Sequence, residues 1–266
     1  MNTFVTLDGL TGSGKTAVGL MLAEALNYFY FEPKALFAHL VPILVDTNGL
    51  IKDANRIIER LASLRIEIVQ ANKRTNRFLK RREAGYEPFI MHFIKYVRPQ
   101  PYQMVTNEGT ISAKIQAAED EYWGFLFGKD RTFSHFVSNP TIYTVLTESI
   151  KQLTAPCGVI MAGDEASPSL IPEAQNKFVL TADLRTRNSR IVDRGRERGA
   201  IWDKSEIMPY TKSRDENDMN RPAHLQFPKD ATLINTENKT VYEVAKIINP
   251  ALELKKPISS KYDWQF

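Results

Sequence analysis

Residues 9–16 read Gly-Leu-Thr-Gly-Ser-Gly-Lys-Thr and restrict the fold of this chain more than any other feature. They fit the P-loop pattern G-x-x-x-x-G-K-[ST], in which glycines let backbone N–H groups turn inward around a phosphate at a helix N-terminus. The pattern requires a strand before the loop and a helix after it. Residues 3–7 form a short apolar run, and residues 17–27 repeat apolar side chains at helical spacing. The sequence therefore predicts a strand, a phosphate-binding loop and a helix at its start.

The P-loop residues carry specific chemical expectations. Lys15 is expected to neutralise the oxygens of the β- and γ-phosphates of ATP, and the Thr16 hydroxyl is expected to bind Mg²⁺. ATP and Mg²⁺ are therefore the predicted cofactors. The residues predicted to bind them are Gly9, Gly12, Ser13, Gly14, Lys15 and Thr16.

The rest of the chain alternates between strand and helix patterns. Short apolar runs predict strands at residues 28–31, 159–162 and 177–180, and apolar side chains at helical spacing predict helices at 50–64, 141–154, 185–198 and 240–248. Such alternation favours a parallel sheet between two layers of helices. The predicted fold class is thus α/β, a three-layer P-loop sandwich with a parallel sheet.

One long stretch does not fit this alternation. Residues 65–128 are basic and aromatic and contain three prolines, so we interpret them as part of an insertion that binds the acceptor substrate. The predicted division is a first core segment at 1–48, the insertion at 49–139, and a second core segment at 140–252. A lid lies at about 183–222, and residues 253–266 form a C-terminal tail.

Charge and composition narrow the expected partners. The net charge is +4, and residues 65–98 contain nine Lys or Arg against three Glu. The basic segment 73–98 is either a solvated surface or a surface that follows a phosphate backbone. No apolar run approaches the ~18 residues that span a bilayer, and no leader pattern is recognisable, so we expect no membrane partner. Cys157 is the single cysteine, which fits a reducing compartment; we expect a cytoplasmic monomer or small homo-oligomer.

Several motifs together resemble the cytidylate kinase family. Asp8 and Gly9 match the D-G that opens the loop in that family, and residues 105–112 are similar to its small β-hairpin with an N-G turn. Residues 159–172 and 177–182 resemble two of its strands. Residues 213–221 resemble the lid motif R-D-x-x-D-x-N-R, and residues 228–236 resemble the terminal strand. The resemblance covers about two-thirds of the chain in pieces and is firmest at its two ends.

The resemblance implies an arginine lid. Arg187 and Arg190 lie where the family has an R-x-x-R helix start, and Arg214 and Arg221 belong to the lid motif. A transferred phosphoryl group needs positive charge around its oxygens, so catalytic roles are expected for Arg187, Arg214 and Arg221. Arg190 is expected to bind ATP, and Asp218 of the lid motif is expected to bind the acceptor. A solvated basic helix remains the alternative for the other arginines of this region.

Arginines are missing at four positions where the family has them. These positions read Ala38, Gln116, Tyr143 and Asp164, the last within Gly163-Asp164-Glu165 where the family has G-R-D. In the family these arginines largely bind the acceptor nucleotide and its monophosphate. A charge-assisted hydrogen bond to phosphate contributes about 1.5–3 kcal/mol, so this chain lacks much of an anion clamp. The sequence therefore predicts a retained donor half and a rebuilt acceptor half of the site.

Glu32, Arg131 and Ser134 are candidates for the rebuilt acceptor half, and three acidic residues are candidates for binding Mg²⁺. Glu32-Pro33 resembles the E-P of deoxynucleoside kinases, whose glutamate takes a proton from an attacking hydroxyl; a surface glutamate is the alternative. Residues 130–132 resemble the nucleoside-kinase D/E-R-S motif, and Arg131 and Ser134 are expected to bind the acceptor. Either Asp130 or the pair Asp164 and Glu165 orders Mg²⁺ at the end of a catalytic strand; the short connection that follows favours the pair.

The predicted activity is transfer of the γ-phosphoryl group of ATP to a pyrimidine nucleotide or nucleoside-type acceptor. The first alternative is a kinase that acts on a hydroxyl of a modified pyrimidine, such as hydroxymethyl-pyrimidine, within DNA bound through segment 73–98. The second alternative is a nucleotide-dependent switch without an acceptor. An intact lid motif disfavours the switch, because a switch needs no arginine lid.

Overall fold

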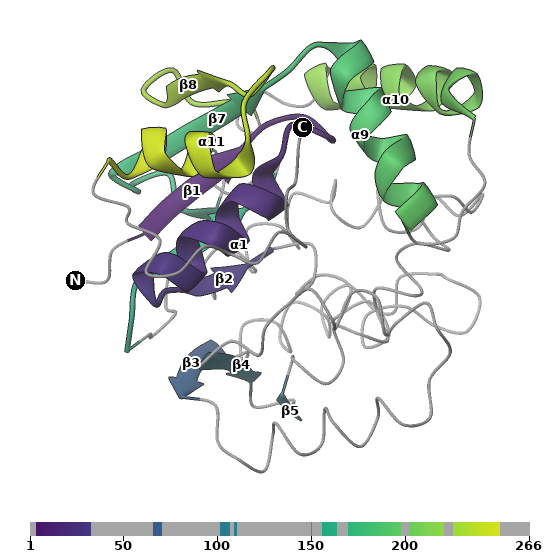
Figure 1. The fold of residues 1–266 in the computed structure, drawn as a ribbon. Coiled ribbons are helices and arrows are strands. Elements are labelled where there is room, and N and C mark those ends of the chain that lie inside the picture. The colour runs from purple at the N-terminus through teal and green to yellow at the C-terminus, as the bar shows by residue number, and fades with distance from the viewer. Residues whose placement is uncertain are drawn as a thin grey trace.

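The structure is a computed structural model. It describes residues 4–32, 66–70, 102–106, 109–110, 150, 156–163, 170–197, 203–220 and 226–250. Figure 1 shows the parallel strands with helices α1 and α11 lying across them, and helices α9 and α10 packed together beyond one end of the strands.

A five-stranded parallel sheet forms the core. Its strands stand in the order β2-β6-β1-β7-β8, and every neighbouring pair is parallel. Their bounds are β1 Phe4–Asp8, β2 Phe29–Phe31, β6 Val159–Ala162, β7 Asn176–Thr181 and β8 Thr232–Asn235. The strands predicted from short apolar runs are therefore confirmed, and the strand that precedes the P-loop lies at the centre of the sheet.

The central strands of this sheet are buried on both faces, whereas the edge strand β8 is mostly exposed. On one face, Ile160 and Leu180 join a hydrophobic cluster with side chains of α1 (Lys15–Leu26) and α11 (Val241–Ile248). On the other face, Val159 and Met161 are also fully buried. A sheet of near-continuous apolar strands that is buried on both sides is typical of α/β proteins, so the predicted fold class is confirmed.

Local signals explain where the helices begin and end. α1 ends at Asn27, a left-handed residue whose N–H donates to the Ala23 carbonyl. α11 begins with a capping box between Thr240 and Glu243. α9 (Leu184–Glu197) follows Asp183, whose carboxylate accepts the N–H of Thr186 at 2.5 Å. These three helices lie within two residues of the predicted bounds.

Helix α10 (Lys204–Met219) was not predicted from the sequence, although the lid motif lies largely within it. It begins after Asp203, whose side chain accepts the Ser205 N–H at 2.7 Å. Pro209 lies inside the helix, and only a few of its residues are apolar, so its helical periodicity is weak. Contacts with α9, described below, hold this helix.

A second, antiparallel sheet has the order β3-β4-β5, with β3 Ile66–Gln70, β4 Tyr102–Thr106 and β5 Gly109–Thr110. Thr106 pairs with Gly109, so the predicted hairpin is confirmed. This sheet lies within the predicted insertion 49–139, whose bounds remain a prediction. The helix expected at 50–64 lies outside the described residues, and of the one expected at 141–154 only Ile150 is described.

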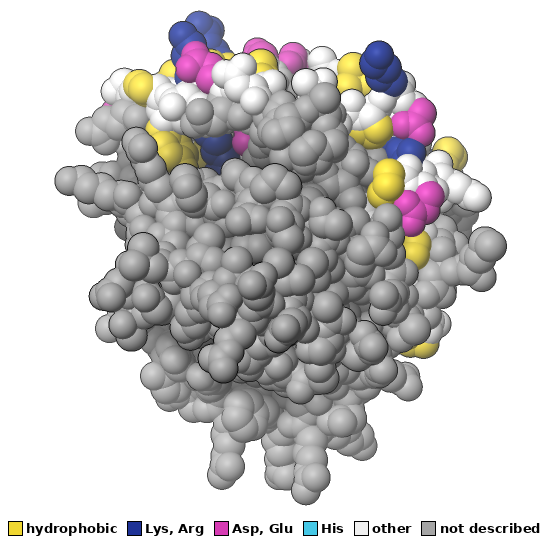
Figure 2. All heavy atoms as spheres, turned by 180° about the vertical axis from the view of Figure 1, so that it is seen from behind, with side chains coloured by type: hydrophobic (Ala, Val, Ile, Leu, Met, Phe, Trp, Pro, Cys, Tyr) yellow, Lys and Arg dark blue, Asp and Glu magenta, His cyan; other side chains and the backbone are white. Residues whose placement is uncertain are grey.

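The surface of the described part of the chain mixes charges of both signs. Figure 2 shows Lys and Arg side chains next to Asp and Glu side chains on the face opposite to that of Figure 1. Among the described residues, no helix has both the length and the apolar character that a membrane-spanning segment needs.

Candidate active site

The loop between β1 and α1 has the backbone conformation that its glycines permit. Gly9, Gly12 and Gly14 all have positive φ angles, of 139°, 83° and 101°. A Cβ on Gly9 would lie 2.2 Å from the Leu180 carbonyl oxygen, and one on Gly12 would lie 2.8 Å from the Arg187 carbonyl oxygen. The loop is therefore packed directly against β7 and α9, and α1 begins at its end with the N-terminal N–H groups of a helix.

The ammonium group of Lys15 folds back over this loop. Its Nζ donates to the carbonyl oxygen of Gly9 and, at 3.1 Å, to that of Leu10. The positive charge thus lies beside the same backbone that would surround a phosphate, where an ammonium stabilises bound negative charge.

Glu32 and Thr16 meet at the carboxyl edge of the sheet. Thr16 lies in the first turn of α1, and Glu32 directly follows β2. The Thr16 hydroxyl donates to Glu32 Oε1 at 2.9 Å, and the Tyr30 hydroxyl donates to the same oxygen. Glu32 is only partly exposed.

Three successive carbonyl groups of the P-loop are held from outside. Arg187 Nη1 donates to Thr11 O at 3.1 Å, and Arg190 Nη1 donates to Gly12 O at 3.2 Å. The Thr236 hydroxyl lies 3.1 Å from Ser13 O and 3.0 Å from Thr181 O, and its single proton serves one of them at a time. Because a trans peptide points its C=O and N–H in opposite directions, these contacts turn the N–H groups of the next residues away from α9 and from Thr236.

Arg190 is also tied to the end of β8. Its Nη1 donates to Thr236 Oγ1 at 3.0 Å, and its Nη2 donates to Thr236 O at 3.0 Å. Burial lowers the pKa of Arg190 to about 10, which still leaves it charged at neutral pH. The predicted ATP-binding residue Arg190 therefore lies directly behind the loop that would hold the phosphates.

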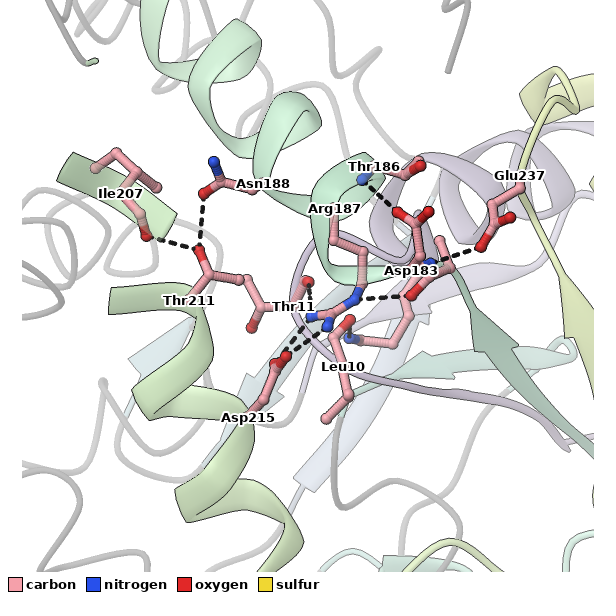
Figure 3. A network of polar contacts seen from close by, with 12 residues as sticks. Leu10, Thr11, Asp183, Thr186, Arg187, Asn188, Ile207, Thr211, Asp215 and Glu237 are labelled. Atoms are coloured by element: carbon pink, nitrogen blue, oxygen red, sulfur yellow. Dashed lines mark hydrogen bonds and ion pairs between the residues drawn. The ribbon is translucent and has the colours of Figure 1, made fainter. Parts of the chain in front are cut away.

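Arg187 is engaged in a buried ion pair with Asp215 of α10. Nη1 donates to Asp215 Oδ1 at 2.9 Å, Nη2 donates to Asp215 Oδ2, and Nε donates to Ala182 O at 3.0 Å. Arg187 and Asp215 are only 4% and 6% exposed. Figure 3 shows the guanidinium between α10 and the P-loop residues Leu10 and Thr11. Together with the Thr11 contact, four of its five N–H groups have partners, so these partners differ from the predicted phosphoryl contact.

The structure describes only some of the remaining predicted residues. Arg214 and Asp218 lie on α10, and both are partly exposed. Outside the described residues lie Arg131, Ser134, Asp164, Glu165 and Arg221.

Two residues at this site were absent from the predicted set. Asp215 belongs to the R-D-x-x-D frame, and the fixed position of that acid beside Arg214 was the available signal. Thr236 follows β8 and ends the segment 228–236 that resembles the family's terminal strand, but that resemblance implied no role for it, and only the fold reveals its contact with the P-loop.

Comparison with known proteins gives a consistent result. A family model described as cytidylate kinase matches residues 95–253, more than half of the 266-residue chain. The cytidylate kinase of Caldicellulosiruptor bescii is 24% identical over 242 residues, which cover 90% of this chain and 91% of that protein. The cytidylate kinase of Thermosipho melanesiensis is 25% identical over 245 residues, which cover 92% and 94%.

A solved structure, TT1252 from Thermus thermophilus, superposes with a TM-score of 0.40 at 14% identity. The superposition covers 95% of this chain and 99% of that one.

Proposed function

The chain belongs to the cytidylate kinase family, and from this premise we propose that it transfers the γ-phosphoryl group of ATP to a pyrimidine nucleotide or nucleoside-type acceptor. As a family member it is an ATP-dependent nucleotide kinase, a transferase, and this disfavours the alternative of a non-catalytic switch. The observation that carries the proposal is the meeting of the P-loop, Thr16 and Glu32 at the carboxyl edge of the parallel sheet. Ligands of open α/β sheets bind at this edge.

On the donor side, the P-loop holds the phosphates of ATP. Lys15 lies beside the backbone that would surround them, and it stabilises the charge that develops on the β- and γ-phosphate oxygens. Gly9, Gly12, Ser13 and Gly14 supply the backbone of the loop. In the transfer, a bond forms between the acceptor oxygen and the γ-phosphorus while the bond to the bridging oxygen breaks, and ADP leaves.

Oxygen donors at this site fit a magnesium ion. The Thr16 hydroxyl and the Glu32 carboxylate lie 2.9 Å apart, and hydroxyl and carboxylate oxygens are the ligands that Mg²⁺ prefers. When bound, the ion neutralises charge on the phosphate oxygens. Thr16, with the predicted residues Asp164 and Glu165, would hold it, and Glu32 accepts the Thr16 hydroxyl proton beside that position.

On the acceptor side, Glu32 is the proposed general base. A hydroxyl nucleophile must lose a proton, whereas a phosphate nucleophile is already ionised. In this proposal Glu32 takes that proton, and its location beside Thr16, only partly in solvent, supports the role. Since Oε1 accepts from Thr16 and Tyr30, an acceptor hydroxyl would be bound by Oε2.

The lid completes the proposed site. Arg214 and Arg221 contact the transferred phosphoryl group as the lid closes, and Asp218 binds the acceptor together with Arg131 and Ser134. Support for these roles comes from the lid motif and from the location of Arg214 and Asp218 on α10, next to the Arg187–Asp215 pair.

Transfer of labelled phosphate from ATP tests the proposal. The acceptors are CMP, dCMP, dTMP, free deoxynucleosides and single-stranded DNA that contains hydroxymethyl-pyrimidine. We expect label on a free pyrimidine nucleotide or nucleoside, with turnover at least about tenfold above that on the DNA. No label on any acceptor with intact ATP binding would contradict the proposal.

The DNA acceptor of this panel tests the alternative function. Its sequence support is the basic segment 73–98, which lies outside the described residues. Label on the DNA alone, together with binding that weakens steeply as salt is raised, would replace the proposed free acceptor with a base in DNA.

A further inference from the structure

Helix α10 is docked on α9 by apolar and polar contacts. Ile191 and Val192 of α9 form a small buried cluster with Ile207 of α10. The Thr211 hydroxyl lies 3.2 Å from Asn188 Oδ1 and 3.0 Å from Ile207 O. Figure 3 shows two separate sets of contacts, those of Thr211 with Asn188 and Ile207 and those of Asp215 with Arg187. The two helices therefore form one packed unit next to the P-loop.

Arg187 connects this unit to the P-loop. Its guanidinium binds both oxygens of Asp215 on one side and the Thr11 carbonyl on the other. Its own backbone packs so tightly on Gly12 that a Cβ there would lie 2.8 Å from the Arg187 carbonyl oxygen. A planar guanidinium with four occupied donors in a buried site permits little independent movement of its partners.

Asp215 stands in the part of α10 that carries the lid motif. Arg214 precedes it, and Asp218 follows at i+3, on the same side of the helix. A change at the P-loop that moves Arg187 must therefore displace or free this segment of the helix.

We propose that Arg187 and Asp215 are positioning residues that couple occupancy of the P-loop by nucleotide to the placement of lid helix α10. The inference rests on the proposed function, because it takes the P-loop as the ATP site. Arg187 then acts through Thr11 and Asp215 rather than on the transferred phosphoryl group. Separating the two buried partners would leave each charge uncompensated in the protein interior. The pair therefore favours a single arrangement of loop and helix.

Hydrogen exchange of Asp215→Asn with and without a non-hydrolysable ATP analogue tests this coupling. Glu216→Gln is the matched control, because it removes an exposed acid from the neighbouring position of the same helix. In the parent and in the control, we expect the analogue to slow exchange in residues 9–16 and in 204–219. In Asp215→Asn, we expect slowing in 9–16 to persist and slowing in 204–219 to fall about fivefold or more.

Steady-state kinetics of the same variants supply a second readout. Asp215→Asn should lower kcat about tenfold while the KM for ATP changes about threefold or less. The reason is that the P-loop still binds ATP, whereas lid helix α10 is no longer positioned by Arg187. Equal slowing of exchange in 204–219 in Asp215→Asn and in the parent would overturn the inference. So would a kcat no lower than that of Glu216→Gln.

A second variant keeps the test decisive if Asp215→Asn unfolds. The double variant Arg187→Met with Asp215→Leu replaces the buried pair by apolar side chains, an exchange that is often neutral for stability. It should fold with α10 docked and show no slowing in 204–219 when the analogue binds; slowing as in the parent would overturn the inference. In the parent, the analogue could slow hydrogen exchange in residues 9–16 and leave it unchanged in 204–219; that result would overturn the inference alone. If the analogue did not slow exchange in residues 9–16 of the parent, the proposed function would be overturned as well.

Discussion

Replacing Thr236 by valine tests how the P-loop is held from behind. Valine keeps the shape of this fully buried side chain and removes its hydroxyl. In this variant the Thr181 carbonyl oxygen still accepts the backbone N–H of residue 236 at 2.8 Å. Arg190 still donates to the carbonyl oxygens of Gly12 and of residue 236. Ser13 O loses the hydroxyl at 3.1 Å. Arg190 Nη1 also loses its acceptor, the Thr236 hydroxyl oxygen at 3.0 Å. Two hydrogen bonds of buried groups are therefore lost, the one that the hydroxyl donates and the one that it accepts, at about 1–3 kcal/mol each and about 2–6 kcal/mol together.

Two measurements check this magnitude. A loss of about 2–6 kcal/mol lowers Tm by roughly 4–24 °C in a chain of this size. If about 1.4 kcal/mol of it is expressed in nucleotide affinity, the Kd for ATP rises about tenfold. Calorimetric unfolding and ATP titration measure the two effects, and Thr236→Ser, which keeps the hydroxyl, is the control. Parent-like Tm and Kd in Thr236→Val would refute the reasoning, and equal losses in Thr236→Ser would assign the effect to packing.

Three further predictions concern the phosphate, the acceptor and acid stability. Lys15→Ala should retain the fold by circular dichroism and lose phosphoryl transfer by about 10³-fold or more, because its charge acts on the β- and γ-phosphates; a folded variant with near-parent rates would contradict the P-loop assignment. Glu32→Gln should lower kcat by about 10²-fold or more with a hydroxyl acceptor and far less with a monophosphate; parent-like turnover on a hydroxyl acceptor would exclude the general base. The hydrogen bond from the Thr186 N–H lowers the pKa of Asp183 below 3.8, so its stabilising contribution is present above that pH and is lost as the pH falls through the folded pKa. Asp183→Asn keeps an acceptor that does not titrate, and its Tm should fall less steeply than that of the parent from neutral pH to about pH 3; parallel curves would show that the cap does not contribute.

The parts of the fold that local chemistry determines were predictable from the sequence. The P-loop glycines, the apolar strands and the capped helix α11 each depend on residues that are close together in the chain. These elements also carry the predicted placement of Lys15 and Thr16 at the start of α1. The hairpin at 105–112 followed from its resemblance to a family motif rather than from periodicity.

The rest depends on contacts between distant residues. Arg187 and Asp215 are 28 positions apart, and Thr236 contacts Ser13 across 223 positions. No periodicity records such contacts. The sequence identified Arg187 as a cation suited to phosphate, and the choice of Asp215 as its partner required the packing of α10 on α9. Likewise, α10 is held by tertiary contacts that its own composition does not reveal.

The sheet order also determines when this protein becomes functional during its synthesis. β1 pairs with β6 and β7, so the first strand made remains without neighbours until residues 159–181 have emerged. The Ser13 carbonyl meets Thr236 only 223 residues later, a delay of about 11–45 s at ribosomal speeds of 5–20 residues per second. A nascent chain therefore carries a complete P-loop sequence long before its phosphate site is assembled. Any shortened chain that ends before β8 would contain the motif and lack the contact that holds Ser13 in place.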